Sequence, residues 1–191
     1  MSNPTDSPAS AEVAARAERR WAIAMVAIVA LLVAIVVFTG LHWAFMPPSR
    51  VETIDPRTLH LRGSEFVESN LGSAVETDGS VTVRVLAQQY SFTPQCLIVP
   101  ADTPITFRAT SADAIHGFLV TGTNLNTMVE PGYISTFRTT FGQTGDHLMP
   151  CHEYCGTGHQ GMWAHVEVVD KDTFMQMAAK AGNARRLSCV K

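Results

Sequence analysis

The chain has few charged residues for its length. Of its 191 residues only 16% are charged, against roughly 25% in an ordinary soluble domain, while 46% are hydrophobic. The formal net charge is −3, and the sequence has no basic stripe of the kind that binds nucleic acid, so no nucleic-acid partner is expected. The length leaves no room for a large multidomain enzyme, and a single long apolar run excludes a polytopic transporter.

The shortage of charge is greatest in one segment near the N-terminus. Residues 21–46 contain no charged side chain, and as a helix they would extend about 39 Å, more than the roughly 30 Å hydrocarbon core of a bilayer. The alternative is a cleaved signal peptide, but its apolar region is shorter and ends at a small-residue cleavage site. A retained single-pass membrane anchor is therefore favoured.

Basic residues flank the anchor on its N-terminal side. Arg16, Arg19 and Arg20 precede it, and positive charge favours the cytoplasmic side of a membrane. The sequence therefore predicts an inner-membrane protein with a cytoplasmic tail over residues 1–20, disordered in its first fifteen residues, and an extracytoplasmic domain.

The exported part changes character at Val81. Residues 47–80 carry Pro, Gly, Ser and charges with little periodicity and are expected to form a linker or extended arm. After them, short β-branched runs are separated by Pro and Gly, which is typical of a small β sandwich or barrel. The runs lie at residues 81–85, 97–99, 105–107, 118–120, 133–137 and 166–169. Residues 81–170 are thus predicted to be one all-β domain, with an excess of acidic residues that would weakly attract a basic partner.

The C-terminal segment, residues 171–191, has two interpretations. Asp170 is a suitable N-cap for a helix from Lys171 to about Ala181, and Gly182 would end it. A solvated tail is the alternative.

The most informative stretch runs from Cys151 to Met162. Within these twelve residues lie two thiols, an imidazole and a thioether, with a further imidazole at His116. Soft and borderline donors of this kind select copper over hard cations. A mononuclear blue copper ion would use His116, one cysteine, His159 and Met162, which leaves the second cysteine unexplained. Two bridging thiolates that hold two copper ions would use every soft donor.

Three simpler interpretations compete with copper. A Cys-x-x-x-Cys pair outside the cytoplasm is often a disulfide. Zinc also binds such pairs, but zinc does not explain a methionine three residues after the histidine. His116 alone would be an ordinary packed or surface imidazole. The combination of His116, His159 and Met162 with the two cysteines favours copper.

These residues resemble a known family. The loop is similar to the binuclear copper A motif Cys-x-Glu-x-Cys-Gly-x-x-His-x-x-Met of subunit II of haem–copper respiratory oxidases. Residues 111–118 resemble the segment around that family's first histidine ligand. The single anchor, Ile54-Asp55-Pro56 and residues 122–126 are most similar to the single-span subunit II of B-family cytochrome c oxidases.

The resemblance implies a cupredoxin-like Greek-key sandwich that holds a binuclear copper centre. Its implied ligands are the side chains of His116, Cys151, Cys155, His159 and Met162 and the main-chain carbonyl of Glu153. The implied function is electron transfer from cytochrome c, or another small carrier, to a haem in subunit I, the membrane subunit that also carries out oxygen reduction. The alternatives are the copper A subunit of a nitric oxide reductase and, in a different class, a membrane-tethered copper chaperone or thiol oxidoreductase using Cys151 and Cys155.

The sequence departs from the family pattern at two places. His152 puts an ionisable group beside the first cysteine, and Gln88 and Gln89 stand where relatives tend to have an aromatic residue. The electron entry route therefore does not carry over, and Tyr90, Phe92 and Trp163 are each expected to be core residues. Outside the motif, Cys96 is expected to be a buried thiol, with pairing to Cys189 as the alternative.

Overall fold

The structure, a computed structural model, describes residues 8–42, 51–182 and 186–189. It divides into two compact units, Met1–Arg50 and Val51–Lys191. Each unit is described below by itself.

The first unit is one long helix, α1 (Pro8–His42). Its segment Ala11–Leu41 is long and apolar enough to cross a membrane, and an 18-residue window within it has a mean hydropathy of 3.1. The helix begins earlier than the expected disordered tail allows, because residues 8–20 are rich in alanine, a strong helix former, and Glu12 and Arg16 form an i,i+4 pair. Residues 43–46, which the predicted anchor includes, lie outside the described residues.

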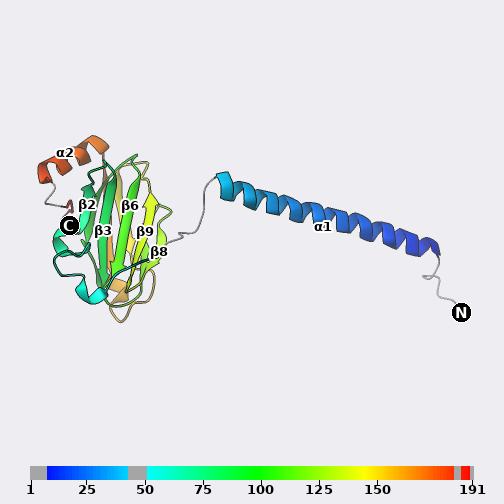
Figure 1. Cartoon of the computed structure of the whole chain (residues 1–191), viewed down its shortest axis with the longest axis horizontal. Coiled ribbons are helices and arrows are strands. Elements are labelled where there is room, and N and C mark those ends of the chain that lie inside the picture. The colour runs from blue at the N-terminus through cyan, green and yellow to red at the C-terminus, as the bar shows by residue number, and fades with distance from the viewer. Residues whose placement is uncertain (1–7, 43–50, 183–185, 190–191) are drawn as a thin grey trace. The chain divides into compact units, whose positions relative to one another are not determined.

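The second unit is built mainly from strands (Figure 1). These strands form three sheets. The largest has the order β1-β9-β6-β3-β2, with β4 also paired to β3; the second is β10-β11-β5, and β7 pairs with β8. The strands are β1 (Glu52–Thr53), β2 (Gly72–Val75), β3 (Val81–Gln88), β4 (Ser91–Thr93), β5 (Cys96–Pro100), β6 (Ile105–Ser111), β7 (His116–Leu119), β8 (Asn126–Val129), β9 (Tyr133–Thr139), β10 (Gly145–Pro150) and β11 (Trp163–Val169). Two pairings, β3 with β6 and β11 with β5, are parallel, and the others are antiparallel.

The core lies between the two larger sheets. Strand β3 directs Val81, Val83 and Val85 inward with almost no exposure, as the period-two pattern predicts. They pack in one cluster with residues of β5, β6, β10 and β11. Phe118 lies at its centre, in ring contact with Phe92, Phe107 and Phe137. The predicted all-β sandwich preceded by one apolar helix is confirmed.

Residues 51–80 differ from the expected linker because they contribute to the fold. Strands β1 and β2 extend the large sheet at its two edges, and two short 3₁₀ helices, η2 (Pro56–Thr58) and η3 (Glu68–Asn70), lie between them. Leu59, Phe66 and Leu71 form a second buried cluster. Glu65 of this segment bonds Arg84 of β3 at 3.1 Å and also contacts Arg108 of β6. The sequence pattern did not predict this docking, because the apolar residues of this segment recur with little periodicity.

Replacing Glu65 with Gln is expected to lower the free energy of unfolding by about 1.5 to 3 kcal/mol, because it removes charge-assisted hydrogen bonds from two half-buried arginines. Burial alone would raise the pKa of Glu65, but the hydrogen bonds and charges of Arg108 and Arg84 outweigh it and lower the pKa. The stabilisation is therefore present above the unfolded value of about 4.3 and is lost as the pH falls through the lower folded pKa.

Urea unfolding of the wild type and Glu65→Gln, with pulse proteolysis as the readout, measures the difference in the free energy of unfolding between pH 7 and pH 3. Glu68→Gln is the matched control, since Glu68 is exposed on the same segment. A Glu65→Gln protein as stable as the control at pH 7 would contradict the assignment.

The C-terminal segment forms a helix followed by a stretch that joins the two sheets. Helix α2 (Lys171–Ala181) has the predicted cap, with the Asp170 carboxylate accepting from the amides of Asp172 and Thr173, and Gly182 follows its end. Beyond it, Leu187 forms a β-bridge with Ser73 of β2, and Ser188 forms one with Leu97 of β5.

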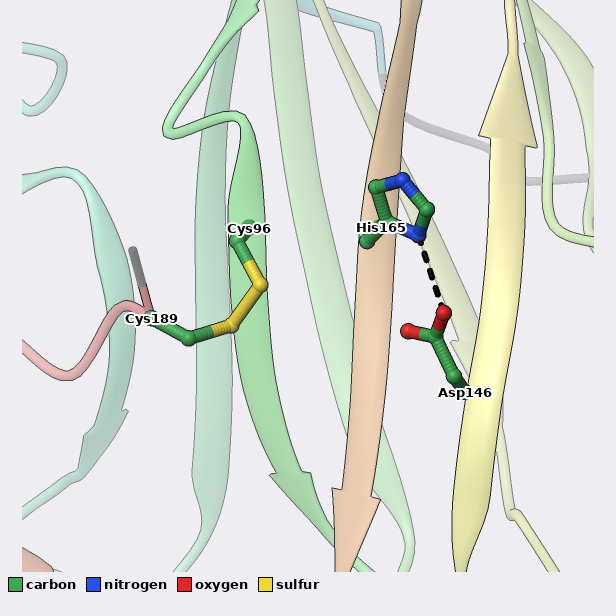
Figure 2. The surroundings of a disulfide bond; sticks show 4 residues. All are labelled: Cys96, Asp146, His165 and Cys189. Atoms are coloured by element: carbon green, nitrogen blue, oxygen red, sulfur yellow. Dashed lines mark hydrogen bonds and ion pairs between the residues drawn. A yellow bond between two sulfur atoms is a disulfide. The ribbon is translucent and has the colours of Figure 1, made fainter. Parts of the chain in front are cut away.

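This return path brings Cys189 to β5, where it forms a disulfide with Cys96 (Figure 2). The two Cα atoms are 5.0 Å apart, within the ordinary range for a disulfide. The expectation of a free buried thiol at Cys96 is wrong, because the sequence does not reveal that the tail folds back beside β5. The disulfide closes a loop with a sequence separation of 93.

Replacing Cys189 with Ser is expected to lower the free energy of unfolding by about 2 to 4 kcal/mol, because a long loop in the unfolded chain is no longer closed. Urea unfolding of the oxidised wild type and the variant measures the difference. Reduced wild-type protein is the control and should match the variant. Equal stability of oxidised wild type and variant would contradict a formed disulfide.

Candidate metal centre

The cysteine-containing loop connects two neighbouring antiparallel strands, β10 and β11. Pro150 and Trp163 are paired at its base, and the amide of Cys151 donates to the carbonyl of Met162 at 3.0 Å. A short 3₁₀ helix, η4 (His159–Gly161), shapes its second half. The two ends of the loop therefore lie side by side, so that Cys151 and Met162, eleven positions apart in sequence, are neighbours.

The loop and strand β7 bring the predicted donor atoms into one cluster. The two thiol sulfurs, of Cys151 and Cys155, are 3.8 Å apart, and both cysteines are free and buried. His116 Nδ1 lies 4.0 Å from the Cys151 sulfur, and the Glu153 carbonyl oxygen lies 3.2 Å from it.

The other two donors face the second cysteine. His159 Nδ1 and Met162 Sδ are each 3.7 Å from the sulfur of Cys155. His116, Cys151 and Cys155 form a group whose donor atoms all lie within 4.8 Å of one another. All six expected donors are thus brought together, with donors on both sides of the sulfur pair.

His116 is oriented by a carboxylate. Its ring is fully buried, and its Nε2 lies 2.9 Å from Asp113 Oδ1. Because a carboxylate only accepts hydrogen bonds, Nε2 is the donor in this bond, and Nδ1 faces the sulfur of Cys151. Burial alone would raise the pKa of Asp113, but the Gln89 amide, the His116 ring and the Ala114 amide outweigh it and lower the pKa. Asp113 is therefore a carboxylate at neutral pH.

The Cys155 thiol keeps its proton in the metal-free domain. Burial, together with the neighbouring Cys151 thiol, raises the pKa of Cys155 to about 11. Because the thiolate is the metal-binding form, a metal ion must displace the proton of Cys155, and its apparent affinity increases with pH.

The loop packs against the rest of the domain at close range. A Cβ on Gly117 would meet the backbone nitrogens of Glu153 and His152 at 2.5 and 2.6 Å. Only a glycine after His116 lets strand β7 approach the loop this closely.

Three aromatic residues near the loop were expected to be core. Phe92 is core, with no exposed area, but Trp163 is 54% exposed and Tyr90 37% exposed. Trp163 points outward because successive side chains of β11 point to opposite faces, and its neighbour Ala164 takes the inward position. The sequence assigned no role to Asp113 or Gln89, although Asp113 lies in the segment that resembles the family's first-histidine segment and Gln89 is one of the departures from the family pattern.

The chain is similar to known proteins of one family. Residues 76–169 match the model described as cytochrome c oxidase subunit II, periplasmic domain. A cytochrome c oxidase subunit 2 of Thermus thermophilus is 36% identical over 155 residues, which cover 79% of this chain and 90% of the relative. The chain belongs to the cytochrome c oxidase subunit II family.

Other members and one solved structure extend the comparison. A second Thermus thermophilus subunit 2 is 39% identical over 64% of this chain and 90% of its own length. The Saccharomyces cerevisiae subunit 2 is 29% identical over 59% of this chain and 46% of its own length. A chain from the cryo-EM structure of a heme-copper terminal oxidase dimer superimposes with a TM-score of 0.60 and 22% identity, over 80% of this chain and 99% of that one. This last likeness concerns the fold.

Family membership settles the general function. The chain is an electron-transfer subunit of a terminal oxidase and works in a complex with other oxidase subunits. The predicted cupredoxin-like fold is confirmed, and the single apolar helix fits a single-pass membrane protein. The thiol, imidazole and thioether donors are a set suited to copper.

Proposed function

We propose that the loop holds a binuclear copper A centre. Its ligands are the side chains of His116, Cys151, Cys155, His159 and Met162 and the carbonyl of Glu153. The observation that carries this proposal is the pair of buried free thiols 3.8 Å apart with donors beside each sulfur. A mononuclear site would leave one sulfur without a role, although donors face both.

The other interpretations of the loop account for fewer observations. In a disulfide the sulfurs would be about 2.05 Å apart, and these are separate thiols. Zinc makes no use of a thioether, yet Met162 is buried with its sulfur 3.7 Å from Cys155. A thiol oxidoreductase places its cysteine pair where a strand meets a helix, whereas this loop joins two strands of one sheet.

When bound, a copper pair would supply one-electron redox chemistry. The protein's contribution is to hold the donors in place. Cys151 and Cys155 are fixed by burial and His116 by Asp113, so that little has to move when the charge changes. Cytochrome c, or another small carrier, is the proposed electron donor, and a haem in subunit I the acceptor.

We also propose that the N-terminus is cytoplasmic and the β domain extracytoplasmic. Arg16, Arg19 and Arg20 lie on the N-terminal side of the apolar part of α1, and basic residues favour the cytoplasmic side. In intact spheroplasts, an added protease should cleave the β domain and leave an N-terminal tag intact. Cleavage of the tag alone would indicate the opposite orientation and contradict the proposal.

The functional test is electron uptake by the full chain in detergent. Copper-loaded protein mixed with reduced cytochrome c in a stopped-flow instrument should oxidise the cytochrome while the visible absorption of the copper site bleaches in parallel. Metal-free protein is the control and should leave the cytochrome reduced. Equal rates with and without copper would contradict the proposal.

A further inference from the structure

The turn between β3 and β4 lies directly on the cysteine loop. The side-chain amide of Gln89 donates to the carbonyl of Cys155, and the Tyr90 hydroxyl lies 3.2 Å from the hydroxyl of Thr157. The loop has glycines where the turn touches it: a Cβ on Gly156 would lie 2.9 Å from Gln89 Nε2, and one on Gly158 would meet the Tyr90 ring. The contact is thus close and includes a directed hydrogen bond.

Gln89 also bonds the segment that carries His116. Its backbone amide donates to Asp113 Oδ2 at 2.7 Å, and the other oxygen of the same carboxylate lies 2.9 Å from His116 Nε2. One residue therefore connects two parts of the metal centre that are distant in sequence. A continuous path of hydrogen bonds runs from the Cys155 carbonyl through Gln89 and Asp113 to the His116 ring.

We propose that Gln89 is a positioning residue of the copper centre, which holds the Cys155 segment of the loop at a fixed position relative to Asp113 and His116. This inference rests on the proposed copper function and deepens it. Partners that orient metal ligands affect metal affinity and redox potential without touching the metal. Because the Gln89 side chain is exposed, its loss should disturb the ligand geometry while the hydrophobic core stays intact.

The neighbouring residue provides a matched control. Gln88 is an exposed glutamine at the end of β3, so Gln88→Met and Gln89→Met make the same chemical change one position apart. Gln89→Met retains the backbone amide and the approximate length of the side chain but removes the donor to Cys155. Gln89→Lys restores a long donor and serves as the rescue variant.

The experiment compares the full-length variants in detergent after copper loading. For Gln89→Met we expect the apparent copper affinity, measured by chelator competition, to fall about tenfold, with a changed EPR hyperfine pattern and a shifted midpoint potential. Gln88→Met should match the wild type in all three measurements, and Gln89→Lys should recover most of the affinity. Urea unfolding of the metal-free proteins should give the same midpoint for all of them.

Two results would overturn the inference. One is a Gln89→Met protein with the affinity, EPR spectrum and potential of Gln88→Met. The other is a fall in the stability of metal-free Gln89→Met large enough to account for its copper loss, since this would make Gln89 an ordinary fold-stabilising residue. Failure of the proposed copper function would look different from failure of this inference. The wild type and Gln88→Met would then themselves lack the EPR signal of one unpaired electron shared by two copper ions.

Discussion

Replacing Cys155 with Ser is expected to abolish the EPR signal of an electron shared by two copper ions and to reduce electron uptake to that of metal-free protein. The buried sulfur of Cys155 lies within 4 Å of the Cys151 sulfur and of the His159 and Met162 donor atoms. A serine hydroxyl in its place is a hard, weak ligand for copper and does not bridge two ions as a thiolate does. At most one copper ion should remain bound, in a mononuclear site.

Copper content by mass spectrometry under non-denaturing conditions and EPR of the loaded full chain measure this loss. Cys189→Ser is the control, because it also removes a cysteine but lies outside the loop. It should retain both copper ions and the shared-electron signal despite its lower stability. A normal signal in Cys155→Ser would exclude the two-thiolate centre.

Replacing Gly117 with Ala is expected to lower the apparent copper affinity by about tenfold or more, because the added methyl group forces the loop away from strand β7. The atoms that a Cβ on Gly117 would meet include the backbone nitrogens of His152 and Glu153. Backbone atoms cannot move aside by a change of rotamer, as the end of a side chain can. Displacement there moves the Glu153 carbonyl and the neighbouring Cys151 relative to His116. Overpacking should also lower the free energy of unfolding by about 1 to 3 kcal/mol.

Gly161→Ala is the matched control within the same loop. A Cβ at Gly161 has no atom within 4 Å, so this variant should bind copper with the wild-type affinity. Chelator competition on the two variants makes the comparison. Equal affinities would mean that the close approach of β7 to the loop does not matter for the site.

The sequence predicted the strands and donors whose signals are local. Val81, Val83 and Val85 alternate as an inward-facing strand must, and the spacing from Cys151 to Met162 allows one loop to hold several soft donors. His116 was selected only by combining it with this loop, and the fold does bring it to 4.0 Å from the Cys151 sulfur.

The features that the sequence did not predict depend on contacts between distant segments. Cys96 and Cys189 meet because the tail after α2 pairs with β2 and β5, and neither cysteine carries a local sign of this. Glu65 docks the segment before β2 through arginines on two other strands. Gln89 reaches the loop from a turn, where no periodic pattern indicates which way a side chain points.

EPR of the copper-loaded full chain tests whether Cys151 and Cys155 would hold two copper ions together. We expect a hyperfine pattern from one unpaired electron shared equally by two copper nuclei, together with intense visible absorption from the thiolate–copper bonds. A pattern from a single copper nucleus, or a chain that binds copper without that absorption, would contradict it.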